Sequence, residues 1–304
     1  MTDASRVSAA AAPNGGRMLA IVTLIRYRFF LFAGLLPYLL GAAWAYARAG
    51  AFDPTLFWAG FGGIILAVVG VETFNEYFDS REGTDRVFNP ADLPPVPARV
   101  FWLGVVAFAG ALAVGVFLAI HVGWPILGFA LLGGIAAVFY EAPPIRWSFR
   151  GFGEAVIGLA YGPWMVLGSV YLHTGELSRD AFWASLVPGF PIMALAVANA
   201  IPDFHQDRLV GKRNLAVRLG RRRAVWLYLS LGALGPLIAM VGTALGFFPM
   251  ACLAAVLALV PLSASARHAI STHENPRAFS QAIRQMIGSY LTGVTLFTLG
   301  LFFP

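Results

Sequence analysis

The sequence predicts an all-α integral membrane protein, a single bundle of about nine transmembrane helices around a central cavity. Of its 304 residues, 59% are hydrophobic and 12% are charged, and the mean hydropathy is +0.73. An average soluble domain carries roughly twice that fraction of charge. Apolar runs of about 18 to 25 residues recur along the chain, each long enough to cross a hydrocarbon core of about 30 Å as a helix. A β-barrel would instead show short segments of alternating polarity.

The predicted spans follow one another with short connections, and they form one polytopic domain over residues 17–304. Residues 1–16 are small and polar and are predicted to be a disordered tail. The nine spans are expected at about 25–47, 55–78, 98–121, 123–140, 152–173, 181–201, 223–246, 248–266 and 283–303.

Individual residues indicate where several spans begin, bend or end. Gly83 follows the last turn of span two, where a helix gives way to a loop. Glu154 opens span five, where an acid either complements the helix dipole or acts in a site. Pro202 is expected to kink span six. Only a few uncharged residues, Leu245 to Pro249, separate spans seven and eight, which predicts a short hairpin.

The Lys and Arg residues predict the orientation. If the N-terminus is cytoplasmic, only Arg48 and Arg179 of the 21 basic residues fall on the outer side. This bias follows the positive-inside rule and predicts a cytoplasmic N-terminus. The membrane is expected to be the bacterial inner (cytoplasmic) membrane. The bias also accounts for the pI near 9.8 through topology and contact with membrane lipids, so no nucleic acid is needed to explain it. The lone Cys252 excludes a disulfide framework within the chain.

Two acidic clusters lie at the predicted inner ends of spans two and six. Each cluster is an Asn followed by two Asp residues, Asn75, Asp79 and Asp85 in the first and Asn199, Asp203 and Asp207 in the second. A spacing of four residues places side chains on one face of a helix. A single cluster of this kind is typical of a solvated membrane boundary. Its repetition at an equivalent position predicts that two acidic faces meet at one membrane depth.

The composition of these clusters predicts a metal site. Carboxylates that gather in an apolar protein repel one another unless cations neutralise them. Oxygen ligands without clustered His or Cys favour Mg²⁺, which completes its shell with water and phosphate oxygens. Arg208, Lys212 and Arg213 follow the second cluster directly. Because proteins hold diphosphates with metal ions and fixed cations, the sequence predicts a magnesium–diphosphate site.

The two clusters also carry a family resemblance. The segments FNEYFDSREGTD and NAIPDFHQDRLVGKRNLAVRLG resemble the two Asp-rich motifs of the UbiA superfamily of intramembrane prenyltransferases. The loop YEAPPIRWSFRGFGE, which begins at Tyr140, is similar to the Tyr-containing loop of that family. The resemblance implies nine transmembrane helices and transfer of a polyprenyl group from an isoprenoid diphosphate to an aromatic acceptor through an allylic cation.

The resemblance further implies roles for particular residues, at a site that faces the cytoplasm. The metal ligands would be Asp79, Asp85, Asp203 and Asp207. The catalytic residues would be Asp79, Asp203, Lys212 and Tyr140. The substrate-binding residues would be Asn75, Asn199, Arg146, Arg208, Arg213 and Glu72. Metal ions and Lys212 would stabilise the departing diphosphate, and the membrane would protect the cation from water.

The acceptor is inferred from finer similarity. The segments GTD, GKRNLAVRLG and GPWMVLGSVYLHTGELS are most similar to the branch that prenylates 1,4-dihydroxy-2-naphthoate in menaquinone synthesis. Other acceptors used within the superfamily are 4-hydroxybenzoate, homogentisate, chlorophyllide and glyceryl phosphate. A cation-coupled transporter is an alternative of a different class, although transporters usually place charged residues near the bilayer midplane.

Glu72 precedes Asn75 by three residues and Asp79 by seven, which places all three on one helical face. An ionisable group at this membrane depth is usually functional. We expect Glu72 either to contact the acceptor or the groups around a metal ion, or to form a structural hydrogen bond with a neighbouring helix.

Overall fold

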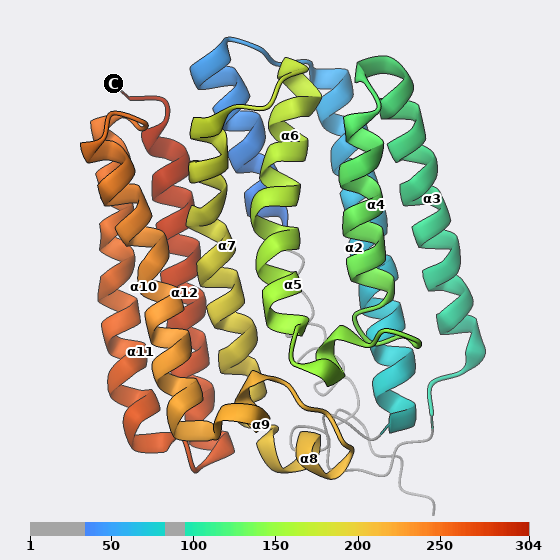
Figure 1. The fold of residues 1–304 in the computed structure, drawn as a ribbon, viewed down its shortest axis with the longest axis vertical. Coiled ribbons are helices and arrows are strands. Elements are labelled where there is room, and N and C mark those ends of the chain that lie inside the picture. The colour runs from blue at the N-terminus through green and yellow to red at the C-terminus, as the bar shows by residue number, and fades with distance from the viewer. Residues whose placement is uncertain (1–33, 83–94, 304) are drawn as a thin grey trace, which may run out of the picture.

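The computed structural model describes residues 34–82 and 95–303, and every regular element within these ranges is a helix. The long helices run side by side in one bundle (Figure 1). After helical residues 34–49, the elements are α2 (Pro54–Glu82), α3 (Ala98–Val122), α4 (Pro125–Val138), η1 (Trp147–Arg150), α5 (Gly153–Leu159), the π-helix η2 (Ala160–Trp164), α6 (Met165–Thr174), α7 (Arg179–Ala200), α8 (Phe204–Leu209), α9 (Leu215–Leu219), α10 (Arg221–Ala244), η3 (Met250–Ala258), α11 (Leu259–Thr272) and α12 (Pro276–Gly300). The predicted tail, residues 1–16, and Asp85 lie outside the described residues.

Six helical segments of the described chain are long and apolar enough to cross a membrane. They are Pro54–Arg81, Ala98–Val122, Gly153–Thr174, Arg179–Ala200, Arg221–Ala244 and Met250–Thr272. The three other predicted spans overlap helical residues 34–49, the shorter apolar helix α4, and α12. The all-helical fold with membrane-crossing helices is therefore confirmed, while the number nine stays a prediction.

The predicted hairpin between spans seven and eight is confirmed. Gly246 adopts a left-handed φ of 79°, which an L side chain rarely tolerates. Its N–H donates to the carbonyl of Thr243 at 3.0 Å, and the N–H of Phe247 donates to the carbonyl of Gly242 at 2.8 Å. These bonds satisfy the last carbonyls of α10 and reverse the chain within a few residues.

The kink expected at Pro202 is also present. α7 ends at Ala200, and a three-residue turn leads to α8. Proline has no N–H to donate and its ring clashes with the preceding helical turn, so the helix stops at this point. As a result, Asn199, Asp203 and Asp207 do not lie on one continuous helix. The first is in the last turn of α7, the second precedes α8, and the third lies within α8.

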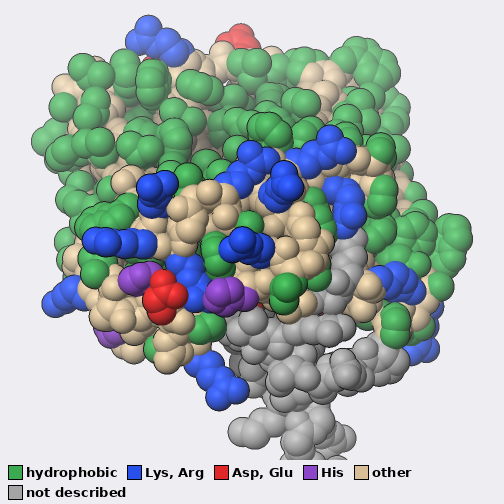
Figure 2. Space-filling view, turned by 60° about the horizontal axis from the view of Figure 1, so that its bottom comes forward, with side chains coloured by type: hydrophobic (Ala, Val, Ile, Leu, Met, Phe, Trp, Pro, Cys, Tyr) green, Lys and Arg blue, Asp and Glu red, His purple; other side chains and the backbone are tan. Residues whose placement is uncertain are grey.

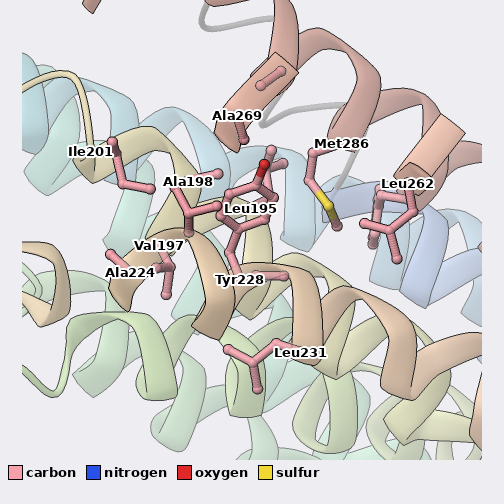
Figure 3. Packing of buried hydrophobic residues seen from close by; sticks show 14 of the residues in the cluster. Leu195, Val197, Ala198, Ile201, Ala224, Tyr228, Leu231, Leu262, Ala269 and Met286 are labelled. Atoms are coloured by element: carbon pink, nitrogen blue, oxygen red, sulfur yellow. The ribbon is translucent and has the colours of Figure 1, made fainter. Parts of the chain in front are cut away.

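The largest buried hydrophobic cluster joins α7, α10, α11 and α12 (Figure 3). Leu195, Tyr228 and Met286 are fully buried in it. The hydroxyl of Tyr228 lies 3.1 Å from Ser265 Oγ, so that its polar group is satisfied inside the core. Gly235 lets α10 approach α7 closely, because a Cβ at this position would lie 2.6 Å from Pro191 Cγ. This densely packed half of the bundle leaves the cavity on the side of α2, α4 and α5.

Candidate active site

A cavity of about 1190 Å³ extends between α2, α3, α4 and the segment from α5 to α6. Its lining includes both Asp79 and Gly60 of α2, which lie about 28 Å apart along the helix at about 1.5 Å per residue. Most of the lining is apolar. The polar residues in it include Glu72, Asn75, Asp79, Tyr140, Glu141, Ser148, Glu154, Asn199, Asp203, Asp207, Lys212 and Asn214.

One face of α2 presents the first acidic cluster to the cavity. Glu72, Asn75 and Asp79 all contribute to the lining, as their helical spacing predicts. The buried Oδ1 atom of Asn75 has no hydrogen-bond partner among the described residues. A buried acceptor without a partner is costly, so this atom is suited to a ligand. Asp85 lies outside the described residues, and its place in the site stays a prediction.

The second acidic cluster reaches the same cavity from α7 and α8. Asn199, Asp203 and Asp207 contribute to the lining, and the two aspartates are only 6% and 4% exposed. Asn214 Nδ2 donates to Asp207 Oδ2 at 2.6 Å, while its Oδ1 accepts from the backbone N–H of Val217 at 2.9 Å and caps α9. The start of α9 therefore holds one oxygen of Asp207 in place.

Lys212 lies at the polar end of the cavity, near Asp79 of the first cluster and Asp207 of the second. Its Nζ is 3.2 Å from Glu141 Oε1, and Ser148 Oγ donates to Glu141 Oε2 at 2.8 Å. Burial by itself lowers the pKa of the Lys212 ammonium. The carboxylates of Glu141, Asp79 and Asp207 outweigh this effect and hold the pKa well above its usual value. Lys212 therefore carries a positive charge near neutral pH.

Of the remaining predicted site residues, Tyr140 lines the cavity and the three arginines do not. Arg146, Arg208 and Arg213 are not among the described residues that line it. The guanidinium of Arg146 lies over the Phe149 ring, 3.6 Å from its centre. The other two arginines are exposed. The structure does not bring these three side chains into the cavity, and their role in substrate binding stays a prediction.

Sequence reasoning missed Glu141 and Asn214. The available signal for Asn214 was its type and place, an asparagine just before an apolar run, which is typical of a helix cap. No spacing marked Glu141, because it lies in a loop. Glu154, for which capping or function was expected, lines the cavity and ties α5 to α9. Its Oε1 accepts from the backbone N–H of Leu215 at 2.9 Å, and its Oε2 is buried without a partner in the described part of the chain.

The donor set at the polar end fits a hard metal ion. Within residues 34–82 and 95–303, no three His, Cys, Asp or Glu side chains lie close enough together to hold a metal ion by themselves. Mg²⁺ does not require such a cage, since it usually takes one or two carboxylates and fills its shell with water and phosphate oxygens. Asp79, Asp203 and Asp207, with the unsatisfied Asn75 Oδ1, supply oxygen donors of that kind.

Apolar side chains line the opposite end of the cavity. Tyr38, Leu118, Ile126 and Leu172 belong to one buried cluster, line the cavity, and are each at most 7% exposed. The Tyr38 hydroxyl donates to the carbonyl of Phe57 at 2.7 Å, so it presents no free polar group to the cavity. This end is suited to hydrocarbon.

Positive charge gathers on the surface at the polar end. Figure 2 shows Lys and Arg side chains on the end of the bundle that carries α8 and α9, beside a broad hydrophobic belt. Exposed arginines on this end include Arg150, Arg213 and Arg218. Arg48 and Arg179 lie at helix ends on the other side of the bundle, away from α8 and α9. The field of the basic end attracts anionic ligands and anionic lipid headgroups.

The chain is similar to known proteins in both sequence and fold. The 1,4-dihydroxy-2-naphthoate octaprenyltransferase of Bacillus subtilis (strain 168) is 25% identical to this chain over 224 residues, which are 71% of this chain and 71% of that protein. Two solved structures show the same fold. A UbiA homologue from Aeropyrum pernix K1 has a TM-score of 0.62 at 16% identity and covers 88% of this chain and 95% of its own. A UbiA homologue from Archaeoglobus fulgidus bound to DMAPP and Mg²⁺ has a TM-score of 0.51 at 14% identity, over 88% of this chain and 98% of its own.

The family itself follows from a match over most of the chain. The model of the UbiA prenyltransferase family matches residues 34–287, a range that includes both acidic clusters, the loop after α4 and Lys212. The chain therefore belongs to the UbiA prenyltransferase family and is a prenyltransferase.

Proposed function

We propose that this enzyme spans the membrane with nine helices and transfers a polyprenyl group from an isoprenoid diphosphate to 1,4-dihydroxy-2-naphthoate, a step of menaquinone biosynthesis. The observation that carries the proposal is the polarity of one cavity. Acids of both clusters and Lys212 lie at one end, and apolar side chains line the other. A prenyl diphosphate has the same division into an anionic head and a hydrocarbon tail. The choice of acceptor rests on similarity to the Bacillus subtilis protein.

The polar end would bind the diphosphate. Asp79, Asp203 and Asp207, joined by Asp85, are the residues that would hold Mg²⁺. When bound, Mg²⁺ neutralises the diphosphate and stabilises the negative charge that develops on it as it leaves. Lys212 adds a fixed positive charge at the same end.

The reaction breaks the bond between the first prenyl carbon and the diphosphate oxygen, and the electron pair of that bond leaves with the diphosphate. The allylic cation that remains is captured by an electron-rich ring carbon of the acceptor, which then loses a proton. Apolar walls exclude the water that would otherwise capture the cation. The ring of Tyr140 lines the cavity near this point and is suited to stabilise the cation through its π system.

The orientation follows from the surface charge. The basic end that carries α8 and α9 would face the cytoplasm, in agreement with the positive-inside rule, and would place the site at the cytoplasmic side of the bacterial inner membrane. The N-terminus would then be cytoplasmic, and the hydrophobic belt would contact membrane lipids.

Incubation of the purified protein with Mg²⁺, geranylgeranyl diphosphate and a panel of acceptors tests this proposal. The panel contains 1,4-dihydroxy-2-naphthoate, 4-hydroxybenzoate, homogentisate, chlorophyllide and glyceryl phosphate. We expect a prenylated naphthoquinol and one diphosphate per product, and we expect EDTA to abolish both and added Mg²⁺ to restore them. Another product would reassign the acceptor. Ion flux into vesicles without release of diphosphate would support the transporter instead.

A further inference from the structure

Glu141 is a buried carboxylate at the polar end of the cavity to which the proposed reaction gives no role. It is 3% exposed, and both of its oxygens are engaged, Oε1 with Lys212 Nζ at 3.2 Å and Oε2 with Ser148 Oγ at 2.8 Å. A negative charge beside a diphosphate repels the ligand unless a cation neutralises it. The ion pair with Lys212 neutralises Glu141, but it also offsets positive charge that Lys212 would otherwise present to the ligand, so the position of Glu141 requires an explanation.

The explanation lies in the way Lys212 is held. The backbone N–H of Lys212 donates to the carbonyl of Asp207 at 2.8 Å, which attaches the residue to the end of α8. Its ammonium is attached to Glu141, which comes from the loop after α4. A lysine side chain has a flexible four-carbon stem and loses rotamer freedom when it binds an anion. Here that freedom is lost before any ligand binds.

The contact with Glu141 still leaves Lys212 able to bind a phosphate. An ammonium group has three N–H donors, and a single carboxylate oxygen needs only one of them. The carboxylates of Asp79 and Asp207 also act electrostatically on this ammonium, so it lies near acids of both clusters. A diphosphate held by those acids through metal ions would meet an ammonium that is already in place.

We infer that Glu141 is a positioning residue that holds Lys212 toward the diphosphate, with Ser148 fixing the second carboxylate oxygen. The inference rests on the proposed function, because it takes the ligand of Lys212 to be a diphosphate. On this inference, Glu141 promotes catalysis only by holding Lys212 in place.

If Glu141 had a purely structural role, it would only hold two regions of the chain together. Arg218 provides a matched control for this alternative. Arg218, in α9, connects the same two regions as the pair of Glu141 and Lys212, namely the segment between α4 and α5 and the segment around α8 and α9. Its guanidinium donates to the carbonyl of Arg213 at 2.9 Å and to the carbonyl of Arg150. These bonds involve neither Lys212 nor Glu141, so Arg218→Met weakens the junction of these regions and leaves the ion pair intact.

A double-mutant cycle on the full-length enzyme tests the inference. In the native background, Glu141→Gln should lower kcat/KM for geranylgeranyl diphosphate about tenfold or more, because misplacement of a group at the reacting centre has a large effect. In the Lys212→Met background, Glu141→Gln should leave kcat/KM unchanged or raise it, because it then only removes an isolated negative charge. Ser148→Ala, which keeps the ion pair, should lower kcat/KM about two- to threefold.

Three further readouts make the result decisive. Arg218→Met should lower the thermal unfolding midpoint in detergent and leave kcat/KM within about twofold. Calorimetry measures the binding of inorganic diphosphate in the presence of Mg²⁺ and without any acceptor. Glu141→Gln should weaken this binding when Lys212 is present and should not weaken it in the Lys212→Met background. The unfolding midpoint of each variant shows whether it is folded.

Each other outcome overturns the inference in a recognisable way. If Glu141→Gln leaves kcat/KM unchanged or raises it in the native background, Glu141 does not help Lys212. If it lowers kcat/KM equally in both backgrounds, or if Arg218→Met causes the same loss, Glu141 only stabilises the local structure. If the unsubstituted enzyme neither releases nor binds diphosphate, the proposed function fails together with the inference. An active unsubstituted enzyme with an equally active Glu141→Gln variant overturns the inference alone.

Discussion

The two ends of the cavity differ in the kind of contact that holds their residues together. At the polar end, Asp79, Asp207, Lys212 and Glu141 come from four separate elements or loops. At the apolar end, Tyr38, Leu118, Ile126 and Leu172 also come from four different helices, and they pack together in one hydrophobic cluster. Charges and hydrogen bonds of defined length hold the polar end together, whereas non-directional packing forms the apolar end.

The difference teaches what each end tolerates. Polar contacts are directional, and a buried charge without its partner is costly, so the polar end should respond sharply to single substitutions. Apolar contacts depend mainly on volume and shape. The apolar end should therefore respond to changes of size and select among substrates by length.

The largest effect is expected from Asp79→Asn, which removes one charge from the polar end and keeps the side-chain volume. We expect kcat/KM to fall about 10²- to 10³-fold, the range found when a group that stabilises a developing charge is lost. Steady-state kinetics over a series of Mg²⁺ concentrations measures it. Asp180→Asn, at a partly exposed position near the opposite end of the bundle, is the control and should retain activity. A fully active Asp79→Asn variant would contradict the assignment of the polar end.

An intermediate effect is expected from Gly134→Leu in the apolar part of the cavity. Gly134 lines the cavity, and a Cβ added there meets no atom within 4 Å. The new side chain would therefore occupy substrate space without disturbing the fold. We expect kcat/KM for geranylgeranyl diphosphate to fall about 10- to 200-fold relative to dimethylallyl diphosphate, because a misfit of a few carbons in an apolar pocket has this size of effect.

Gly128 provides the control for this substitution. It lies on the same helix, a Cβ there also meets no atom within 4 Å, and it does not line the cavity. Gly128→Leu makes the same change in helix propensity, so it separates backbone effects from occlusion. An identical loss in the two variants, or no preference for the shorter donor in Gly134→Leu, would show that the prenyl chain lies elsewhere.

The smallest effect is expected at Glu72, which lies on α2 between the two ends of the cavity. If it contacts the acceptor, Glu72→Ala should raise the KM of the acceptor about two- to tenfold, the equivalent of one hydrogen bond, and leave the binding of inorganic diphosphate unchanged. Parallel titrations with acceptor and with diphosphate distinguish these cases. Equal values for the variant and the unsubstituted enzyme would assign Glu72 a structural hydrogen bond instead.

Hydropathy and helical spacing accounted for much of the fold and part of the site. Long apolar runs predicted helices because a bilayer-spanning helix has to satisfy its own backbone hydrogen bonds. The spacing of Glu72, Asn75 and Asp79 predicted their common face because all three lie on one uninterrupted helix. The same argument failed for Asn199 and Asp207, since Pro202 ends α7 between them.

The sequence by itself determined the helical membrane class, the family, and the two acidic clusters, because composition, motif and period are local properties of the chain. Only the tertiary structure decided that Glu141 and Asn214 join the acids, and that Arg208 and Arg213 face solvent. These side chains lie in short helices and loops, where no single period governs direction. Contacts between elements distant in sequence orient them, and such contacts exist only after the bundle has packed.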